Sequence, residues 1–142
     1  MIISEKKQSI TSAKELAAVC HKILATEHEI DKSREHFWAI GINTKNVIQY
    51  VELVSLGSLS ASIVHPRETF RFAVMKGVAA LFIAHNHPSG DTKPSQEDIL
   101  LTRRLTQAGE VLGIKILDHI IVSGADDYGY FSFSETGMIA SG

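Results

Sequence analysis

Residues 78–84 form an unbroken run of seven apolar residues, and a polar segment that begins with His85 follows directly. The run lacks the alternation of apolar and polar residues that marks a strand with one solvent-facing side. A short apolar run set among helical segments is typical of a strand buried on both faces of a sheet. It is also far below the roughly 20 apolar residues that a membrane-spanning helix needs. We therefore expect a central strand here and no association with a membrane.

Helical periodicity precedes and follows this strand. One helix is expected after Thr11 or Ser12, either of which can cap it, a second from Pro66, and a third from Ser95. Their buried faces are predicted by apolar or small residues spaced mostly three or four apart. These are Leu16, Val19, Cys20, Ile23 and Leu24 in the first helix, Phe70, Ala73, Val74 and Gly77 in the second, and Leu101, Leu105, Ala108 and Leu112 in the third.

Further strands complete the predicted sheet. Segments 36–42 and 47–54 are rich in β-branched and aromatic residues and flank the turn-rich residues 43–46, which predicts an antiparallel hairpin. Additional strands are expected at 59–64, 115–122 and 128–133. Helices that alternate with strands after an early hairpin predict an α/β fold, with a mixed sheet and helices on both of its faces. We expect one domain over residues 1–142, with residues 1–10 loosely ordered.

Charge and cysteine content exclude several functions. The 142 residues carry a net charge of −2, with a pI near 6.4, which argues against a strongly basic nucleic-acid-binding domain. The single cysteine, Cys20, excludes a disulfide framework and a zinc site built from several thiolates. The first residues are charged where a signal peptide would be apolar, so a cytoplasmic location is expected.

The polar segment after the central strand carries the candidate site. His85 and His87 are two residues apart, and Pro88 keeps His87 extended, so both imidazoles should point to one side and could chelate a transition metal. Asp98 follows as the last residue of a Ser95-x-x-Asp98 pattern. That pattern taken alone favours a helix capping box, although Ser95 can cap the backbone while Asp98 still faces a metal. Two nitrogens and one oxygen would leave a fourth tetrahedral position for water, as in catalytic zinc sites.

Hydrolysis also needs a base that takes the proton of the attacking water. The residues alone leave several glutamates open for this role, namely Glu27, Glu29, Glu35, Glu52, Glu68 and Glu97.

The arrangement of Glu35, His85-x-His87 and Ser95-x-x-Asp98 resembles the JAMM/MPN+ metalloprotease motif. The blocks His85-Asn-His-Pro-Ser-Gly-Asp91, Pro94-Ser-x-x-Asp98 and Leu117-Asp-His-Ile-Ile121 resemble those of RadC-like proteins, from about residue 9 to residue 133. The resemblance implies a three-layer α-β-α sandwich of the JAB/MPN (cytidine deaminase-like) fold. It also implies a zinc-dependent peptidase that cleaves a peptide or isopeptide bond in a peptide or protein substrate.

The same resemblance assigns the roles of the site residues. It maps His85, His87 and Asp98 onto the ligands of Zn²⁺, Ser95 onto the hydroxyl that holds the carbonyl oxyanion, and Glu35 onto the general base, with Glu52 as the alternative. Asn86 departs from the Ser or Thr that deubiquitinating relatives carry between the two histidines.

A second class of function stays open. RadC-like proteins are associated with DNA repair, so the alternative is a DNA-binding or protein-interaction module with a silent metal site. Asp118 or His119 could orient a ligand imidazole, because metal-bound histidines usually donate their other N–H to a partner. His65 is expected to end a strand or cap a helix rather than to bind metal. The oligomeric state is left open.

Overall fold

The computed structural model describes residues 2–3, 8–27, 29–60, 62–124 and 129–139. Six strands form one mixed sheet in the order β1-β3-β2-β4-β5-β6, in which β4 and β5 are parallel and every other neighbouring pair is antiparallel. The strands are β1 (Ile2–Ile3), β2 (His36–Ile42), β3 (Ile48–Leu56), β4 (Ala80–Asn86), β5 (Lys115–Val122) and β6 (Tyr130–Ser132). The helices are α1 (Ala13–Ala25), α2 (Glu29–Lys32), α3 (Pro66–Thr69), α4 (Arg71–Lys76) and α5 (Gln96–Leu112).

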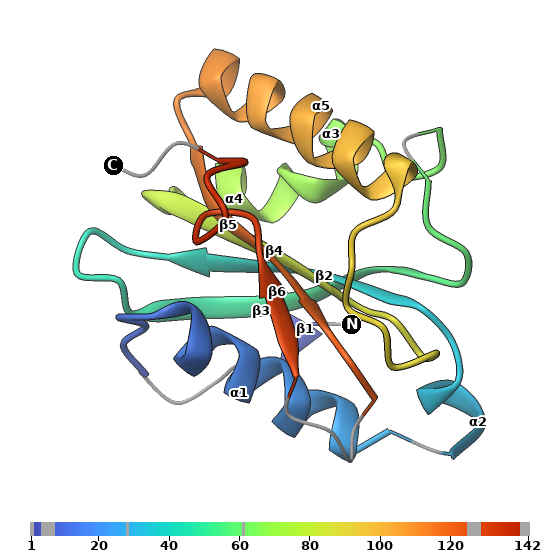
Figure 1. Ribbon diagram of the computed structural model, residues 1–142. Coiled ribbons are helices and arrows are strands. Elements are labelled where there is room, and N and C mark those ends of the chain that lie inside the picture. The colour runs from blue at the N-terminus through green and yellow to red at the C-terminus, as the bar shows by residue number, and fades with distance from the viewer. Residues whose placement is uncertain (1, 4–7, 28, 61, 125–128, 140–142) are drawn as a thin grey trace.

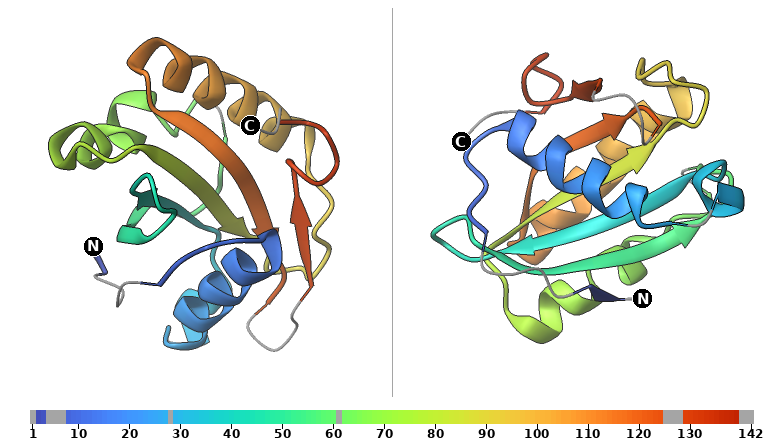
Figure 2. Two further views of the ribbon diagram at one scale, coloured as in Figure 1. Left: turned by 90° about the vertical axis from the view of Figure 1, so that its left-hand side faces the viewer. Right: turned by 90° about the horizontal axis from the view of Figure 1, so that it is seen from below.

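Helices cover both faces of the sheet, as the sequence predicts. Figure 1 shows α1 on one side and α3, α4 and α5 on the other, and the turned views of Figure 2 show the same layers. The two faces of β4 belong to two separate apolar clusters, one containing residues of α1 and the other residues of α5. Phe82 and Ala84 belong to the α1 cluster, whereas Leu81 and Ile83 belong to the α5 cluster. Side-chain alternation along β4 therefore directs the odd-numbered residues, and with them His85, towards α5.

The predictions of the central strand, the hairpin and the first helix are confirmed. All seven residues of β4 are buried between β2 and β5. The strand starts at Ala80 and continues through Asn86, so His85 lies in the strand and not in the loop after it. Strands β2 and β3 pair antiparallel. Helix α1 begins after Ser12, whose side chain accepts a hydrogen bond from the backbone N–H of Glu15.

Three local predictions are wrong. The described residues of 59–64 form turns and no strand, because their backbone groups bond locally or to Glu35: Val64 donates to the carbonyl of Ser60, and Leu59 donates to the Glu35 carboxylate. The helix predicted from Pro66 is divided at Phe70 into α3 and α4. Val74 and Leu112, predicted to lie on buried helix faces, are 57% and 49% exposed.

The N-terminal segment, expected to be loosely ordered, contributes the short strand β1, which pairs with β3. Ser9 also forms a bridge with Val47, and Ile10 is buried. Residues 1 and 4–7 lie outside the described residues, as does residue 128 of the predicted last strand. Within the described part of the chain, no helix is both long and apolar enough to cross a bilayer.

Candidate metal centre

The site lies where the parallel strands β4 and β5 end and α5 begins. His85 is the sixth residue of β4 and is fully buried, and His87 follows the strand directly. Asp98 is the third residue of α5, and the loop 87–95 connects it to the histidines. The carboxyl ends of parallel strands and the N-terminus of a helix meet at this edge, which is the usual place of binding sites in open α/β sheets.

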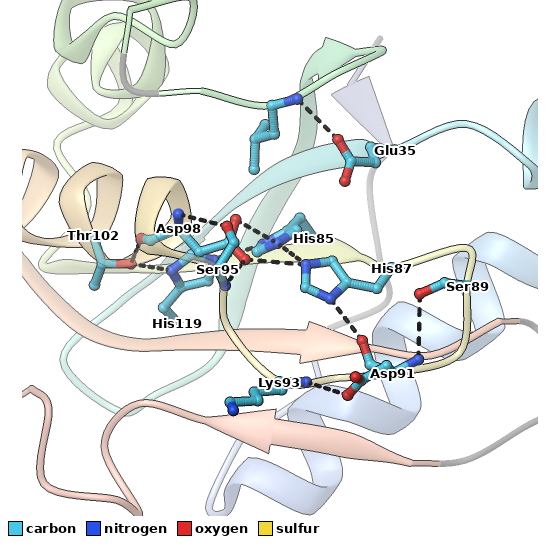
Figure 3. Close-up of polar contacts among 11 residues, drawn as sticks. Glu35, His85, His87, Ser89, Asp91, Lys93, Ser95, Asp98, Thr102 and His119 are labelled. Atoms are coloured by element: carbon cyan, nitrogen blue, oxygen red, sulfur yellow. Dashed lines mark hydrogen bonds and ion pairs between the residues drawn. The ribbon is translucent and has the colours of Figure 1, made fainter.

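Three potential ligand atoms converge at this edge (Figure 3). His85 Nε2 lies 3.0 Å from His87 Nε2 and 3.2 Å from an Asp98 carboxylate oxygen, and His87 Nε2 lies 3.1 Å from the other oxygen. An ion about 2.0–2.1 Å from three tetrahedral ligand atoms would hold them about 3.3–3.4 Å apart. The side chains therefore fit a small divalent cation, and the expectation that both imidazoles face one side is confirmed.

Asp98 serves the helix and the cluster at once. Its backbone N–H donates to the Ser95 hydroxyl at 3.0 Å, and its carboxylate accepts from the Ser95 backbone N–H at 2.8 Å, which completes a capping box. The same carboxylate faces both histidines. The capping and the metal-facing interpretations of this residue are therefore compatible, because the two carboxylate oxygens offer more acceptor positions than the capping box uses.

The electrostatics of the cluster favour an ionised carboxylate beside a neutral His85. Burial lowers the pKa of His85, and its contact with Asp98 offsets only part of that effect. The hydrogen bond to Asp98 raises the pKa of His87. Burial opposes ionisation of Asp98, but its contacts with both histidines outweigh that effect and keep the pKa of Asp98 below its usual range. An anionic oxygen beside imidazole nitrogens is a donor set suited to Zn²⁺ and similar metals.

Glu35 reaches the site through the pairing of β2 with β4. Phe37 pairs with His85 across these antiparallel strands. Continuing this register by two residues sets Glu35 opposite His87. One oxygen of the half-buried Glu35 carboxylate accepts from the backbone N–H of Leu59 at 2.9 Å, and the side chain lies beside the cluster in Figure 3. Its negative charge acts on both imidazoles.

Glu52, the alternative base, lies elsewhere. It is buried in β3, and its charged neighbours are Arg71, 4.0 Å away, and Glu68. Among the six glutamates that the sequence left open, only Glu35 acts on the pKa of both His85 and His87 within the described residues.

Ser95 is the N-cap residue of α5, three residues before Asp98. Its hydroxyl oxygen accepts from the Asp98 N–H, which leaves the hydroxyl proton without a hydrogen-bond acceptor among the described residues. The side chain is exposed, so that proton can reach a bound molecule.

Asn86 is a residue whose part in the site the sequence reasoning missed. It is fully buried on the face of β4 opposite the histidines. Its side-chain oxygen accepts from the backbone N–H of His36, and its amide nitrogen donates to the carbonyl of Arg34 at 3.0 Å. These two bonds fix the backbone on either side of Glu35, at Arg34 and at His36. The sequence carries no signal for this role, because it depends on the pairing of strands 50 residues apart.

The structure also places the three residues whose roles were left open. His119, in β5, is fully buried, and its Nε2 lies 2.8 Å from Nδ1 of His85. Asp118 points away from the cluster and accepts hydrogen bonds from Ser132 and Ser134. His65 occupies the N-cap position of α3, where its side chain makes no capping hydrogen bond, and it lies outside the cluster.

Comparison with known proteins identifies relatives of this chain. A family model described as the RadC-like JAB domain matches residues 10–138. The chain is 46% identical over 121 residues to a UPF0758 protein of Desulforamulus reducens, an alignment that covers 85% of this chain and 51% of the relative. It is 42% identical over 137 residues to a UPF0758 protein of Methanosarcina mazei, covering 96% of this chain and 56% of the relative. The chain thus spans about half the length of these curated relatives.

The resemblance in sequence motifs, the match of the family model and the α/β architecture agree. The match includes both strands that end at the site, the loop with the two histidines and the whole of α5. The chain therefore belongs to the RadC-like JAB domain family.

Proposed function

We propose that this domain is a zinc-dependent peptidase that hydrolyses a peptide or isopeptide amide bond. The observation that carries the proposal is the convergence of His85 Nε2, His87 Nε2 and the Asp98 carboxylate at 3.0–3.2 Å, with Glu35 beside them. In this proposal the three residues hold Zn²⁺, which would polarise a substrate carbonyl and lower the pKa of a water molecule towards about 7.

Glu35 would carry the proton of the reaction. One of its carboxylate oxygens is held by the Leu59 N–H, and the side chain is half buried, so the carboxylate is oriented but accessible. As the water oxygen bonds to the carbonyl carbon, Glu35 accepts the water proton. It then passes that proton to the amide nitrogen while the carbon–nitrogen bond breaks, so that an acid and an amine leave.

Ser95 would stabilise the oxygen of the tetrahedral intermediate. Its hydroxyl oxygen accepts from the backbone N–H of Asp98, so its proton remains available to a bound molecule near the cluster. A donor placed where negative charge develops is worth several kcal/mol when water is excluded. Removal of the hydroxyl should therefore slow turnover more than it weakens substrate binding.

The substrate is proposed only as a class. The site lies at the carboxyl ends of the inner strands β4 and β5, and the exposed Ser95 hydroxyl and the half-buried Glu35 carboxylate lie near it. This arrangement fits an extended peptide or a flexible isopeptide linkage. Because the relatives are about twice as long as this chain, the part of those proteins beyond the domain could select the protein that is cleaved.

Elemental analysis and a peptidase assay test the proposal together. Purified protein should contain about one zinc per chain, and it should release fragments from a mixture of peptide and isopeptide substrates. Glu35→Gln should keep the zinc and lose turnover, because Gln has the same shape but cannot take the proton. Glu110→Gln is the matched control, since it removes the same charge from an exposed position near the far end of α5.

Two results would contradict the proposal. Full turnover in Glu35→Gln would remove Glu35 from its role. Protein that binds no zinc but binds DNA with a steep salt dependence would favour the alternative, a DNA-repair-associated module with a silent site.

A further inference from the structure

His85 belongs to a buried hydrogen-bond network that continues through His119 to Thr102. His85 Nδ1 lies 2.8 Å from His119 Nε2, and His119 Nδ1 contacts the hydroxyl of Thr102 in α5. All three side chains are at most 3% exposed. This network therefore links the hydrogen-bonding state of His85 to a helix residue, Thr102, that contacts only the backbone of Asp98 and none of the three ligand side chains.

The direction of these hydrogen bonds follows from the number of protons. The Thr102 hydroxyl donates its single proton to the backbone carbonyl of Asp98 at 2.7 Å, one turn earlier in α5. It can therefore only accept from His119, which places a proton on His119 Nδ1. A neutral His119 then has a lone pair on Nε2 and accepts from His85 Nδ1–H. A neutral His85 is left with its own lone pair on Nε2, the atom that faces His87 and Asp98.

The opposite direction would block the site. If Thr102 donated to His119 Nδ1, His119 would donate from Nε2 to His85 Nδ1. A neutral His85 would then carry its proton on Nε2, where it would donate to the Asp98 carboxylate 3.2 Å away. A protonated nitrogen has no lone pair for a metal ion, so the two directions correspond to a metal-accepting and a metal-excluding His85.

Aromatic contacts fix the orientation of the His119 ring. Phe133 stacks on the ring with centroids 4.7 Å apart and planes 8° apart, and Phe37 meets it edge-on at 6.2 Å. Asp118 accepts from the backbone N–H groups of His119 and Ser134 and from the Ser132 hydroxyl, and so ties both residues that flank Phe133 to β5. The two aromatic contacts restrict rotation of the His119 ring, which keeps its nitrogens aligned with Thr102 and His85.

We propose that His119 is a positioning residue that selects the Nδ1–H tautomer of His85, and that Thr102 sets this choice through its bond to the Asp98 carbonyl. The inference rests on the metal site of the proposed function, but it does not depend on the reaction or on the substrate. It assigns a role to Asp118 and His119, the two polar residues of the block 117–121, which take no part in the proposed mechanism.

Thr102→Val and Thr106→Val provide a matched pair of variants. Thr106 donates to the carbonyl of Thr102 at 2.7 Å, the same one-turn-back bond in the same helix, but it does not contact His119. Cobalt(II) and zinc affinities of the metal-free proteins are measured by competition with a chromogenic chelator. Thr102→Val should weaken both affinities about 10- to 100-fold, as loss of an outer hydrogen-bonding partner does in other metal sites. Thr106→Val should keep them near the wild-type values.

Substitutions of His119 separate hydrogen bonding from packing. His119→Gln retains an acceptor for His85 Nδ1–H and should stay closer to wild-type affinity than His119→Phe, which fills the space but offers none and should lose about 10- to 100-fold. Long-range proton–nitrogen NMR spectra of zinc-loaded wild-type protein should show the proton of His85 on Nδ1. Circular dichroism of the metal-free variants shows which of them are folded.

The outcomes separate this inference from the proposed function. Wild-type protein that binds zinc, with Thr102→Val and His119→Phe binding equally well, would overturn the inference alone. A proton on His85 Nε2 in the zinc-loaded protein would do the same. Wild-type protein with no affinity for zinc or cobalt would overturn both. Absence of peptidase activity would contradict the proposed function but not the role of His119, because metal affinity is measured without substrate.

Discussion

The Asp98 carboxylate accepts a hydrogen bond from the backbone N–H of Ser95 at 2.8 Å, and the same carboxylate faces the two imidazoles that converge beside it. One side chain thus fixes the start of α5 and completes the cluster. The helix N-terminus also favours a negative charge at this position. Ser95 and Asp98 can therefore be separated experimentally, since one substitution removes the cap and another removes the metal-facing charge.

Asp98→Asn should abolish the stabilisation of the protein by zinc. Zinc at 100 times its dissociation constant should raise the free energy of unfolding of the wild type by about 2.7 kcal/mol. Asn can still accept from Ser95, but the metal-free variant should be less stable than the wild type, because the helix N-terminus and both histidines favour the negative charge that Asn lacks. Ser95→Ala should also lose about 1 kcal/mol in the metal-free protein, but it should retain the zinc-induced gain. Urea unfolding with zinc or with a chelator measures both, and an equal zinc-induced gain in Asp98→Asn would contradict the assignment.

Asn86→Ala should destabilise the protein while leaving zinc affinity unchanged. The substitution leaves the His36 N–H and the Arg34 carbonyl without their side-chain partner at the start of β2, at a cost of about 2 kcal/mol. The ligand atoms lie on the other face of β4 and keep their contacts. Equilibrium urea unfolding of the metal-free protein provides the measurement. A change below about 0.5 kcal/mol, the range of ordinary surface substitutions, would show that these bonds contribute little.

Glu52→Gln should stabilise the protein at neutral and alkaline pH. Burial raises the pKa of Glu52, Arg71 offsets part of that effect, and one carboxylate oxygen has no hydrogen-bond partner among the described residues. The folded state therefore holds the Glu52 proton more tightly than the unfolded chain, and ionisation costs stability as the pH rises through the raised pKa.

The gain from Glu52→Gln should be near zero at about pH 4, below the pKa of an unfolded glutamate, and should reach about 1 kcal/mol at about pH 8. Urea unfolding at a series of pH values measures it, with the exposed Glu110→Gln as the control for loss of one negative charge. A gain that is largest at low pH would have the wrong sign for a raised pKa.

Gly41→Ala should destabilise the hairpin. A Cβ atom at residue 41 would lie 2.2 Å from the ring of Tyr50, the residue paired with it across β2 and β3. Tyr50 is 1% exposed, so its ring has no free space to move into. Overpacking of this kind costs about 1–3 kcal/mol. Gly124→Ala serves as the control in thermal unfolding, because no described atom lies within 4 Å of the added carbon; equal effects of the two substitutions would exclude the steric explanation.

Local sequence patterns predicted much of the fold and the cluster. The central strand follows from an unbroken apolar run, whereas α1 and α5 follow from apolar periodicity and capping residues. All three signals depend on neighbours that are close in the sequence. The convergence of His85 with His87, and the place of Asp98 at the start of α5, depend on spacings of two and three residues. Such short spacings are set by the geometry of strands and helices, so a sequence displays them directly.

Other features depend on contacts between distant segments. Residues 59–64 have strand-like composition, but hydrogen bonds to Glu35 and to their own turn satisfy their backbone instead. The place of Glu35 near the histidines depends on the pairing of Phe37 with His85, and the hydrogen bonds of Asn86 depend on the same pairing. Composition and periodicity do not predict the register in which two strands pair.

By itself, then, the sequence determined the elements and the local donor set: two imidazoles at the end of a buried strand and one carboxylate at a helix start. The tertiary structure decided which groups surround that set. Strand β2 brings Glu35 to it and is held by Asn86 of β4, whereas β5 and α5 supply His119 and Thr102. The physical reason is that strand register and helix docking arise from the packing of both apolar clusters as a whole. No single segment contains the information that aligns them.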